Sequence, residues 1–374
     1  MQAVILVGGK GTRLRPLTTN RPKPLVPLVD RPFLAHMLEW VASHGIEDVV
    51  MCCGFLADAL VDELGDGSRF GVRLTWVQEP DPRGTAGALR FAEPHLQERF
   101  VMLNGDVLTD LDLTAQVEQH RATGAVGTLA LVPVDDPASY GLVRMNDDRS
   151  VRGFLEKPDP AEIDTDLISA GAYVLERSVL DLIPEGRMVS IEREVWPRLV
   201  GAGLHGCVHR GAYWMDIGTP DRYLQGTDDI LCGRVRTRVA DRLLDGPVDP
   251  AAEVAADAVV DHGALIDRGA RVGAGSIVGA GSVVGPDAVI GEDVVLDRAV
   301  VLAGAVVGAG ARLRRCVVGA GARLEAGVRL EDATMIGDGA TIGAGNALGR
   351  GIRVAPGASV PAAAITFPAT PEAA

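Results

Sequence analysis

An aliphatic residue recurs at every sixth position through the last third of the chain. The first run of nine such residues is Val254, Val260, Ile266, Val272, Val278, Val284, Ile290, Leu296 and Leu302. After a slip of two residues the period resumes at Val318, Leu324, Leu330, Ile336, Ile342, Leu348, Val354 and Val360. Neither an α-helix nor an alternating strand has this period. It is typical of a prism of short strands, each sending one aliphatic side chain inward.

The composition supports this interpretation, since 46 glycines and only 4% aromatic residues suit a chain that turns a tight corner every few residues. A disordered Gly/Ala-rich tail is the alternative, but disorder would not keep aliphatic residues in register. We therefore predict a left-handed parallel β-helix of hexapeptide repeats over residues 254–360. Each coil buries its faces only against its neighbours, which favours capping or self-association, and we expect a homo-oligomer.

The first 231 residues show a different pattern, in which short apolar runs alternate with amphipathic stretches. The predicted strands are Ala3–Val7, Val49–Cys53, Leu74–Gln78, Phe100–Leu103, Gly127–Val132 and Ala172–Leu175, and the predicted helices include Phe33–His44 and Phe55–Leu64. This alternation predicts an α/β, Rossmann-like domain with a mostly parallel sheet that binds ligands at the carboxyl ends of its strands. A turn-rich linker is expected at 232–253, and a poorly ordered end or short cap at 361–374.

Charge and apolar run length limit the possible partners. A formal net charge of −14 disfavours nonspecific binding to nucleic acid or anionic membranes. No apolar stretch reaches the roughly 18–20 residues of a membrane span. The five cysteines show no metal-ligand spacing and no even disulfide framework, and we find no secretory leader, so we expect a cytoplasmic protein.

A glycine-rich turn follows the first predicted strand. Gly8, Gly9 and Gly11 allow backbone N–H groups to approach a triphosphate, and Thr12 and Arg13 follow directly. A turn that needs glycine only for tight packing is an equally good explanation. The spacing fits neither the phosphate loop ending in Gly-Lys-Ser/Thr nor the dinucleotide-binding fingerprint.

Lys23 lies between two prolines, which stiffen the backbone and can aim an ammonium group into a site. Taken alone, a solvated lysine in a turn is the better explanation of this segment.

Several motifs in a fixed order make the first domain similar to the sugar-1-phosphate nucleotidyltransferases. They are Leu6–Leu17, Pro22-Lys23-Pro24, Gly84–Leu89, Asn104-Gly105-Asp106, Phe154–Pro158 and Trp214–Pro220. Members of this family commonly carry a hexapeptide β-helix after the catalytic domain, so the predicted second domain agrees with the resemblance.

The resemblance implies roles for the charged residues in transfer of a nucleotidyl group from a nucleoside triphosphate to a sugar 1-phosphate. Arg13 would contact the β- and γ-phosphates, Lys23 the α-phosphate and Lys157 the sugar phosphate. Asp106 and Asp216 would hold Mg²⁺, which accepts one or two carboxylates together with phosphate oxygens. For either aspartate alone, a turn or a helix cap is the commoner role.

The resemblance also implies contacts with the nucleobase and the sugar. The nucleotide side comprises Leu6, Gln78, Gly84 and Thr85, and the sugar side comprises Gly141, Glu156, Lys157 and Gly171. Strand-end polarity and tight turns remain alternative reasons for these residue types.

Within the family, Ser190–Pro197 and Trp214–Gly218 resemble the branch that makes GDP-mannose from GTP and mannose 1-phosphate. Enzymes that make dTDP-glucose or UDP-glucose share most of the other motifs and remain alternatives. Ser169 stands where the mannose branch usually has Asn, which leaves an epimer or a cyclitol phosphate open as the acceptor.

Two other functional classes remain. A β-helix acyltransferase would need a histidine base in the coils, yet His262 is the only histidine after His209. A non-catalytic sugar-nucleotide sensor acting through the β-helix has little use for the paired aspartates.

Overall fold

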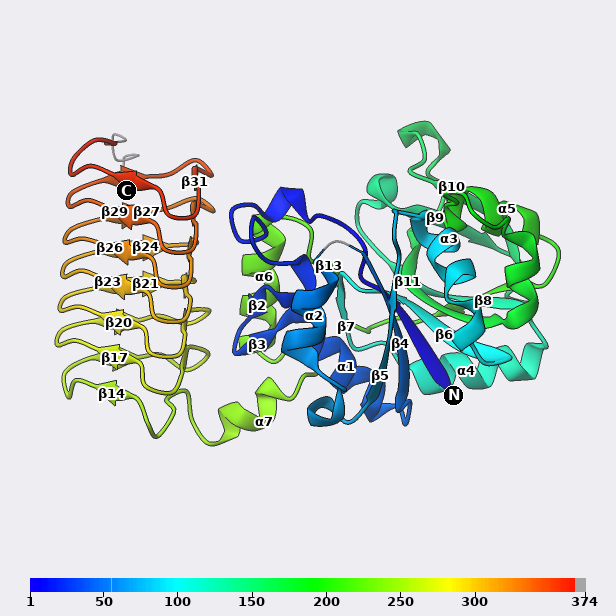
Figure 1. The fold of residues 1–374 in the computed structure, drawn as a ribbon, viewed down its shortest axis with the longest axis horizontal. Helices are drawn as coiled ribbons and strands as arrows, with labels where there is room; N and C mark the ends of the chain where they lie inside the picture. The colour runs from blue at the N-terminus through cyan, green and yellow to red at the C-terminus, as the bar shows by residue number, and fades with distance from the viewer. Residues whose placement is uncertain (55, 367–374) are drawn as a thin grey trace. The chain divides into compact units, whose positions relative to one another are not determined.

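The computed structural model describes residues 1–54 and 56–366 (Figure 1). Two compact units divide the chain. The first unit comprises residues 1–9 and 34–216, and the second comprises residues 10–33 and the chain from Ile217 onward.

The first unit contains a nine-stranded sheet whose parallel part was predicted from the alternating pattern. The parallel strands are β1 (Gln2–Leu6), β4 (Asp48–Cys53), β5 (Arg73–Gln78) and β6 (Arg99–Asn104), in the order β6-β1-β4-β5. Because all four run the same way, their carboxyl ends meet at one edge.

Strand β11 (Leu167–Glu176) extends this sheet by pairing antiparallel with β6. Beyond it lie β8 (Gly127–Pro133), β9 (Gly141–Met145), β10 (Val151–Glu156) and β12 (Leu204–Val208). The β11–β8 ladder is interrupted between Ser169 and Tyr173, where Gly171 adopts a left-handed φ of 74°. This bulge turns β11 at the edge where the predicted site residues gather.

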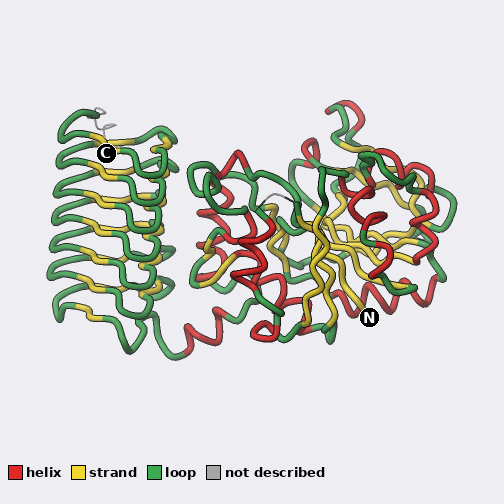
Figure 2. The backbone as a smooth tube through the Cα atoms, in the orientation of Figure 1, coloured by secondary structure: helices red, strands yellow, loops and turns green. Residues whose placement is uncertain are grey.

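Helices pack around the sheet of the first unit (Figure 2). They are α1 (Phe33–Ser43), α2 (Ala57–Leu64), α3 (Gly84–Phe91), α4 (Leu113–Thr123) and α5 (Trp196–Leu199). The core includes the fully buried rings of Tyr173 and Trp196, with centroids 5.1 Å apart. A separate two-stranded ribbon joins β7 (Val107–Thr109) to β13 (Trp214–Asp216).

The second unit contains the predicted β-helix, in which parallel strands stack into three sheets of seven, six and six strands. Its strands are β14 (Glu253–Val254), β15 (Val259–Val260), β16 (Leu265–Ile266), β17 (Arg271–Val272), β18 (Ile277–Val278), β19 (Val283–Val284), β20 (Val289–Ile290), β21 (Val295–Asp297), β22 (Val300–Val301), β23 (Val306–Val307), β24 (Arg312–Arg314), β25 (Val317–Val318), β26 (Arg323–Leu324), β27 (Arg329–Leu330), β28 (Met335–Ile336), β29 (Thr341–Ile342), β30 (Ala347–Leu348), β31 (Arg353–Val354) and β32 (Ser359–Val360). This is the architecture of a left-handed parallel β-helix.

The predicted register of the β-helix was wrong at one place. Val301, not Leu302, belongs to the internal aliphatic cluster, and the later members Val307 and Leu313 were missed. The six-residue spacing shortens to five twice, between Leu296 and Val301 and between Leu313 and Val318. The physical reason lies at the corners after β21 and β24, which turn with one residue fewer.

The second unit also holds a short ribbon and two helices: β2 (Pro27–Leu28), β3 (Arg31–Pro32), α6 (Pro220–Leu231) and α7 (Val239–Leu244). Helix α7 lies inside the segment predicted as linker. Its Arg242 contacts Asp30 over 3.1 Å and Asp267 over 3.0 Å, so this segment is tied into the unit by ion pairs.

The predicted tail, 361–374, lies outside the described residues from position 367 onward. Among the residues that are described, no helix is long and apolar enough to cross a bilayer.

Candidate active site

The β7–β13 ribbon brings the two predicted metal ligands together. In its antiparallel ladder, Asp216 is the partner of Val107, the residue that directly follows Asp106. The two aspartates, 110 positions apart in the sequence, therefore lie on adjacent chains at one end of the ribbon.

Two aromatic residues that the sequence analysis did not select hold Asp216. The Tyr140 hydroxyl donates to Oδ1 of Asp216 over 3.0 Å. The Trp214 ring packs edge-on against Tyr140, at a centroid distance of 5.1 Å, and its Nε1 donates to the carbonyl of Ala170 over 2.8 Å. Trp214 lies inside a motif that carries the family resemblance, and Tyr140 directly precedes the predicted Gly141. Their positions next to predicted residues were the only sequence feature that could have identified them as site residues.

Asp106 follows a turn that requires glycine. A Cβ on Gly105 would lie 2.7 Å from the Leu6 carbonyl oxygen, too close for any other residue. The predicted residue Leu6 thus lies against the turn that presents Asp106.

Asn104, at the end of β6, was another omission from the predicted site. A Cβ on Gly171 would approach Nδ2 of Asn104 to 2.9 Å, so the bulge in β11 needs glycine there. The Asn104 Oδ1 atom is buried and has no hydrogen-bond partner among the described residues. A buried acceptor of this kind is available to a bound ligand.

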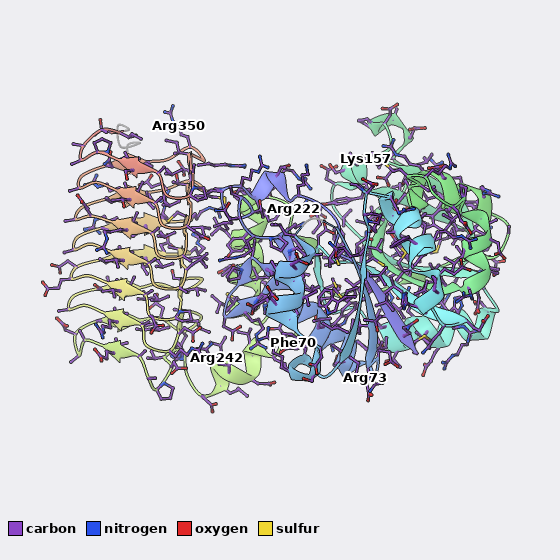
Figure 3. The ribbon with its side chains drawn as sticks, in the orientation of Figure 1. Phe70, Arg73, Lys157, Arg222, Arg242 and Arg350 are labelled. Atoms are coloured by element: carbon purple, nitrogen blue, oxygen red, sulfur yellow. The ribbon has the colours of Figure 1, made fainter. Side chains whose placement is uncertain are left out.

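The sugar-side residues Gly141 and Glu156 are direct partners in the β9–β10 ladder. A Cβ on Gly141 would lie 2.6 Å from the Phe154 ring and 3.2 Å from the Glu156 carboxylate. Lys157, labelled in Figure 3, follows Glu156 directly. Its backbone is left-handed, with a φ of 53°, and its N–H donates to the Tyr140 carbonyl. These three residues therefore lie beside Tyr140, whereas Gly171 lies against Asn104.

Burial raises the pKa of Glu156, and the nearby carboxylate of Glu192 raises it further. The cations Lys157 and Arg193 act in the opposite direction on the same pKa, without cancelling the shift.

Glu192 was not predicted as a site residue, although it lies in the segment used for the mannose resemblance. Its Oε2 accepts hydrogen bonds from the Thr85 hydroxyl at 3.0 Å and the Ser190 hydroxyl at 2.8 Å. Thr85 also accepts from the backbone of Ile191 over 2.8 Å. A Cβ on Gly84 would lie 2.6 Å from the Val189 carbonyl oxygen. In this structure the predicted Gly84 and Thr85 therefore fix the start of α3 against residues 189–192.

The hydroxyl of Ser169 donates to the hydroxyl of the buried Tyr173 over 3.1 Å. This residue, which departs from the mannose branch, thus has a partner within its own strand.

The remaining nucleotide-side residues lie at carboxyl strand ends. Gln78 is the last residue of β5, and its side chain is exposed. Gly8 and Gly9 follow β1, and nothing lies within 4 Å of a Cβ built on either one. Open space beside these glycines leaves their backbone accessible to a ligand.

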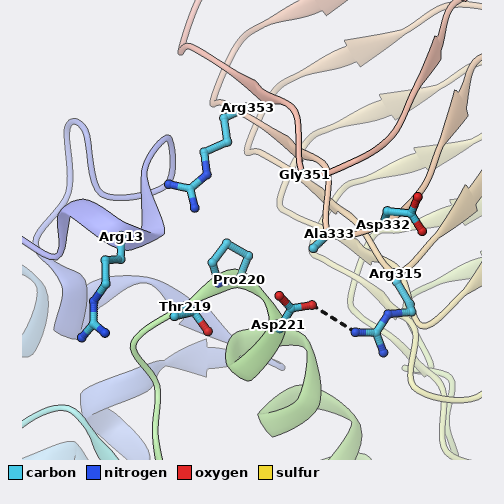
Figure 4. A pocket seen from close by; sticks show the side chains of 9 residues that line it. All are labelled: Arg13, Thr219, Pro220, Asp221, Arg315, Asp332, Ala333, Gly351 and Arg353. Carbon is cyan, nitrogen blue, oxygen red and sulfur yellow. Dashed lines mark hydrogen bonds and ion pairs between the residues drawn. The ribbon is translucent and has the colours of Figure 1, made fainter. Parts of the chain in front are cut away.

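The second unit holds the other predicted phosphate ligands. Gly11 adopts a φ of 55°, and a Cβ there would lie 2.9 Å from the Cβ of Lys23. Thr18 closes the same loop by donating to the Gly11 carbonyl over 2.7 Å. The loop therefore packs Gly11 directly against Lys23. Thr12 and Arg13 form the next turn with exposed side chains, and Arg13 lines a pocket within this unit (Figure 4).

Asp106 and Asp216 fit a hard divalent cation. Within residues 1–54 and 56–366, no group of three or more His, Cys, Asp or Glu side chains could hold a metal. Two carboxylates suit an ion that takes its remaining ligands from phosphate oxygens and water, as Mg²⁺ does.

The chain is similar to proteins of known function in both sequence and structure. The chain is 41% identical to a mannose-1-phosphate guanylyltransferase of Mycobacterium tuberculosis over 71% of this chain and 76% of that protein. It is 36% identical to a mannose-1-phosphate guanylyltransferase catalytic subunit beta of Drosophila pseudoobscura pseudoobscura, over 68% and 70% of the two chains. The crystal structure of HddC from Yersinia pseudotuberculosis matches 60% of this chain and 97% of its own, with a TM-score of 0.53 and 28% identity.

Two family models match the two parts of the sequence. Residues 260–365 match the GMPPB C-terminal domain, and residues 2–232 match the nucleotidyl transferase model. The chain therefore belongs to the nucleotidyl transferase family and is a nucleotidyltransferase that carries a C-terminal β-helix.

Proposed function

We propose that the protein transfers a guanylyl group from GTP to mannose 1-phosphate, forming GDP-mannose and releasing pyrophosphate. The printed activity of the relatives at 36–41% identity supports this pair of substrates. The observation that carries the catalytic assignment is the β7–β13 ladder, which puts Asp106 and Asp216 on adjacent chains.

In the proposed reaction a phosphate oxygen of the sugar attacks the α-phosphorus of GTP. The bond from that phosphorus to the bridging α–β oxygen breaks, and its electron pair leaves with pyrophosphate. The attacking oxygen is already ionised near neutral pH, so the chain has no proton to remove. Its task is to hold two polyanions together and to offset their charge.

Each charged residue has one part in that task. Asp106 and Asp216 hold Mg²⁺, which when bound neutralises phosphate charge and orients the triphosphate. Arg13 binds the β- and γ-phosphates, Lys23 the α-phosphate and Lys157 the phosphate of the sugar.

The other predicted site residues provide selectivity. Glu156 accepts hydrogen bonds from sugar hydroxyls, while Gly141 and Gly171 leave space for the sugar ring. Leu6, Gly8, Gly9 and Gln78 border the nucleotide, and Gly11, Thr12, Gly84 and Thr85 shape the segments around it.

We also propose residues 1–231 as the catalytic domain, 232–253 as the linker, 254–360 as the β-helix and 361–374 as a tail. The limits of the two family matches support this division. We further propose that the protein is cytoplasmic and forms a homo-oligomer through the β-helix.

A substrate matrix tests the reaction. Purified protein is assayed for pyrophosphate release with GTP, ATP, UTP or dTTP as donor. Each donor is tested with mannose 1-phosphate, glucose 1-phosphate and an inositol phosphate, in Mg²⁺ or in EDTA. GTP with mannose 1-phosphate is expected to give the highest kcat/KM, and only with the metal. A preference for dTTP or UTP with glucose 1-phosphate would replace the substrate pair, and no turnover with any pair would favour a sensor.

A further inference from the structure

A cavity of about 660 Å³ lies within the second unit, between the turn that carries Arg13, the start of α6 and the corner of the β-helix (Figure 4). It is lined by Arg13, Thr219, Pro220, Asp221, Arg315, Asp332, Ala333, Gly351 and Arg353. Three of these nine residues are arginines.

One corner of the β-helix lies against α6, and the residue at this corner differs from coil to coil. At Gly281 a Cβ would lie 2.6 Å from the Asp228 carboxylate of α6, so glycine is needed there. Farther along the same corner Arg298 and Arg315 replace glycine, although their φ angles of 47° and 45° are left-handed. Such conformations are unfavourable for a residue with a Cβ. In return, the Arg315 side chain forms an ion pair with Asp221 of α6, over 3.2 Å.

Only some of the charged side chains that line the cavity form ion pairs with one another. Asp221 is engaged by Arg315, and Figure 4 shows the Asp332 carboxylate directed away from the other lining side chains. Arg353 extends from β31 toward the segment that carries Arg13. Both arginines are exposed, and neither forms an ion pair with any residue that the structure describes. Arg13 and Arg353 thus both line this cavity, in a protein of net charge −14.

The start of α6 adds to this positive character. Thr219 is the N-cap and Pro220 the first helical residue of this 12-residue helix, whose N-terminal peptide dipoles favour an anion. Guanidinium groups bind phosphate oxygens through paired, charge-assisted hydrogen bonds.

We propose that this cavity binds a phosphate-bearing anion, with Arg13 from the glycine-rich segment and Arg353 from the β-helix as its two cationic arms. The role of Arg13 as a phosphate ligand rests on the proposed function, whereas the role of Arg353 does not. The β-helix then contributes a ligand-binding residue as well as a scaffold.

Calorimetric titration with inorganic pyrophosphate, without metal or nucleotide, tests the proposal on the full-length chain. Arg353→Gln should weaken binding about tenfold, because one charge-assisted contact is lost. Asp221→Asn should tighten binding about threefold, because it removes a carboxylate and releases Arg315. The matched control is Arg323→Gln, which changes an exposed arginine at the equivalent first position of β26 and should leave the affinity unchanged.

Competition identifies the source of the anion. If GTP displaces pyrophosphate and Arg353→Gln raises the KM for GTP, the cavity takes the phosphates of the substrate. If GTP does not compete, the cavity serves a separate phosphorylated effector. Both outcomes support the proposal. Absence of pyrophosphate binding, or equal affinities for wild type, Arg353→Gln and Arg323→Gln, would overturn it while leaving the guanylyl transfer assay to decide the proposed function by itself.

Discussion

The hydroxyl of Tyr140 donates a hydrogen bond to Oδ1 of Asp216 over 3.0 Å. Tyr140 directly precedes strand β9, whose first residue, Gly141, pairs with Glu156 of β10. The proposed metal ligand and the proposed sugar-binding strand are therefore connected through one side chain. A carboxylate with one oxygen fixed in this way has fewer orientations available, which favours a single geometry toward a metal.

Tyr140→Phe removes that hydrogen bond and keeps the ring against Trp214. We expect the Mg²⁺ concentration for half-maximal activity to rise about tenfold, as for other partners of metal ligands. The KM for mannose 1-phosphate should change little. Turnover measured against Mg²⁺ concentration checks this, and an unchanged metal dependence would mean that Tyr140 has only a packing role.

Asp106→Asn keeps the shape of the side chain and removes its charge. We expect kcat to fall by about 10²-fold or more, because the charge that holds the metal at the phosphates is lost. Asp147→Asn, at an exposed turn of the same unit, is the matched control and should keep full activity. Equal melting temperatures for both variants would exclude unfolding as the cause, while near wild-type turnover of Asp106→Asn would remove it from the metal site.

The β-helix was predictable because its signal is local. One aliphatic residue in six points inward, so a run of such residues reports the coils directly. The error at Leu302 arose because the corner that contains Arg298 turns with one residue fewer than most corners of the β-helix. Nothing in the aliphatic pattern marks that residue, and two such corners produced the apparent slip of two.

The active site was less accessible from sequence because its contacts are long-range. Asp106 and Asp216 were selected through the family motifs, and only the β7–β13 register explains their proximity. Tyr140 acts through a contact 76 positions away, which no local pattern encodes. Thr85 was selected through a motif, yet its hydroxyl donates to Glu192, 107 positions away, in a contact that the motif does not reveal.

Glu156 should make kcat/KM for the sugar phosphate depend on pH on the acidic side of neutrality. Burial and Glu192 raise the pKa of its carboxyl above the ordinary value of 4.5, so it becomes neutral at a higher pH than an exposed glutamate does. If the carboxylate accepts hydrogen bonds from the sugar, kcat/KM for mannose 1-phosphate falls as the pH drops toward that raised pKa. Near neutral pH, Glu156→Gln should raise the KM for the sugar phosphate about tenfold and leave the KM for GTP unchanged.

The ratio of the wild-type and Glu156→Gln pH profiles isolates this effect, because ionisation of the sugar phosphate is common to both. The ratio should decline toward one with decreasing pH, since protonated glutamate resembles glutamine. A ratio that is constant with pH would show that the charge of Glu156 plays no part in sugar binding.

His120 should make the stability of the first unit depend on pH. Its fully buried ring lies between the Thr128 hydroxyl, 2.8 Å from Nδ1, and the Glu176 carboxylate, 3.0 Å from Nε2. Burial lowers the pKa of His120 below its ordinary value of 6.5, despite the opposing effect of Glu176. The neutral ring, with the proton on Nε2, satisfies both neighbours.

The sign of the effect follows from proton binding. Below pH 6.5 the unfolded chain binds a proton at His120 that the folded chain does not, so the free energy of unfolding decreases as the pH falls from about 6.5. Glu176, whose pKa is lowered from 4.5, loses its stabilising effect only at more acidic pH. Burial also lowers the pKa of His209 in the same unit, so urea titrations between pH 5 and 8 must compare the wild type with a His120 variant. All four tryptophans lie in the first unit, so their fluorescence follows that unit alone.

His120→Gln should reduce the free energy of unfolding at pH 8 by about 1–3 kcal/mol, because the amide cannot satisfy both buried neighbours as the ring does. The same variant should make the decline between pH 6.5 and 5 shallower, since glutamine does not titrate and the effect of His209 remains. His95→Gln, at an exposed position of the same unit, should keep the wild-type slope. A slope in His120→Gln equal to that of the wild type would assign the pH dependence to another group.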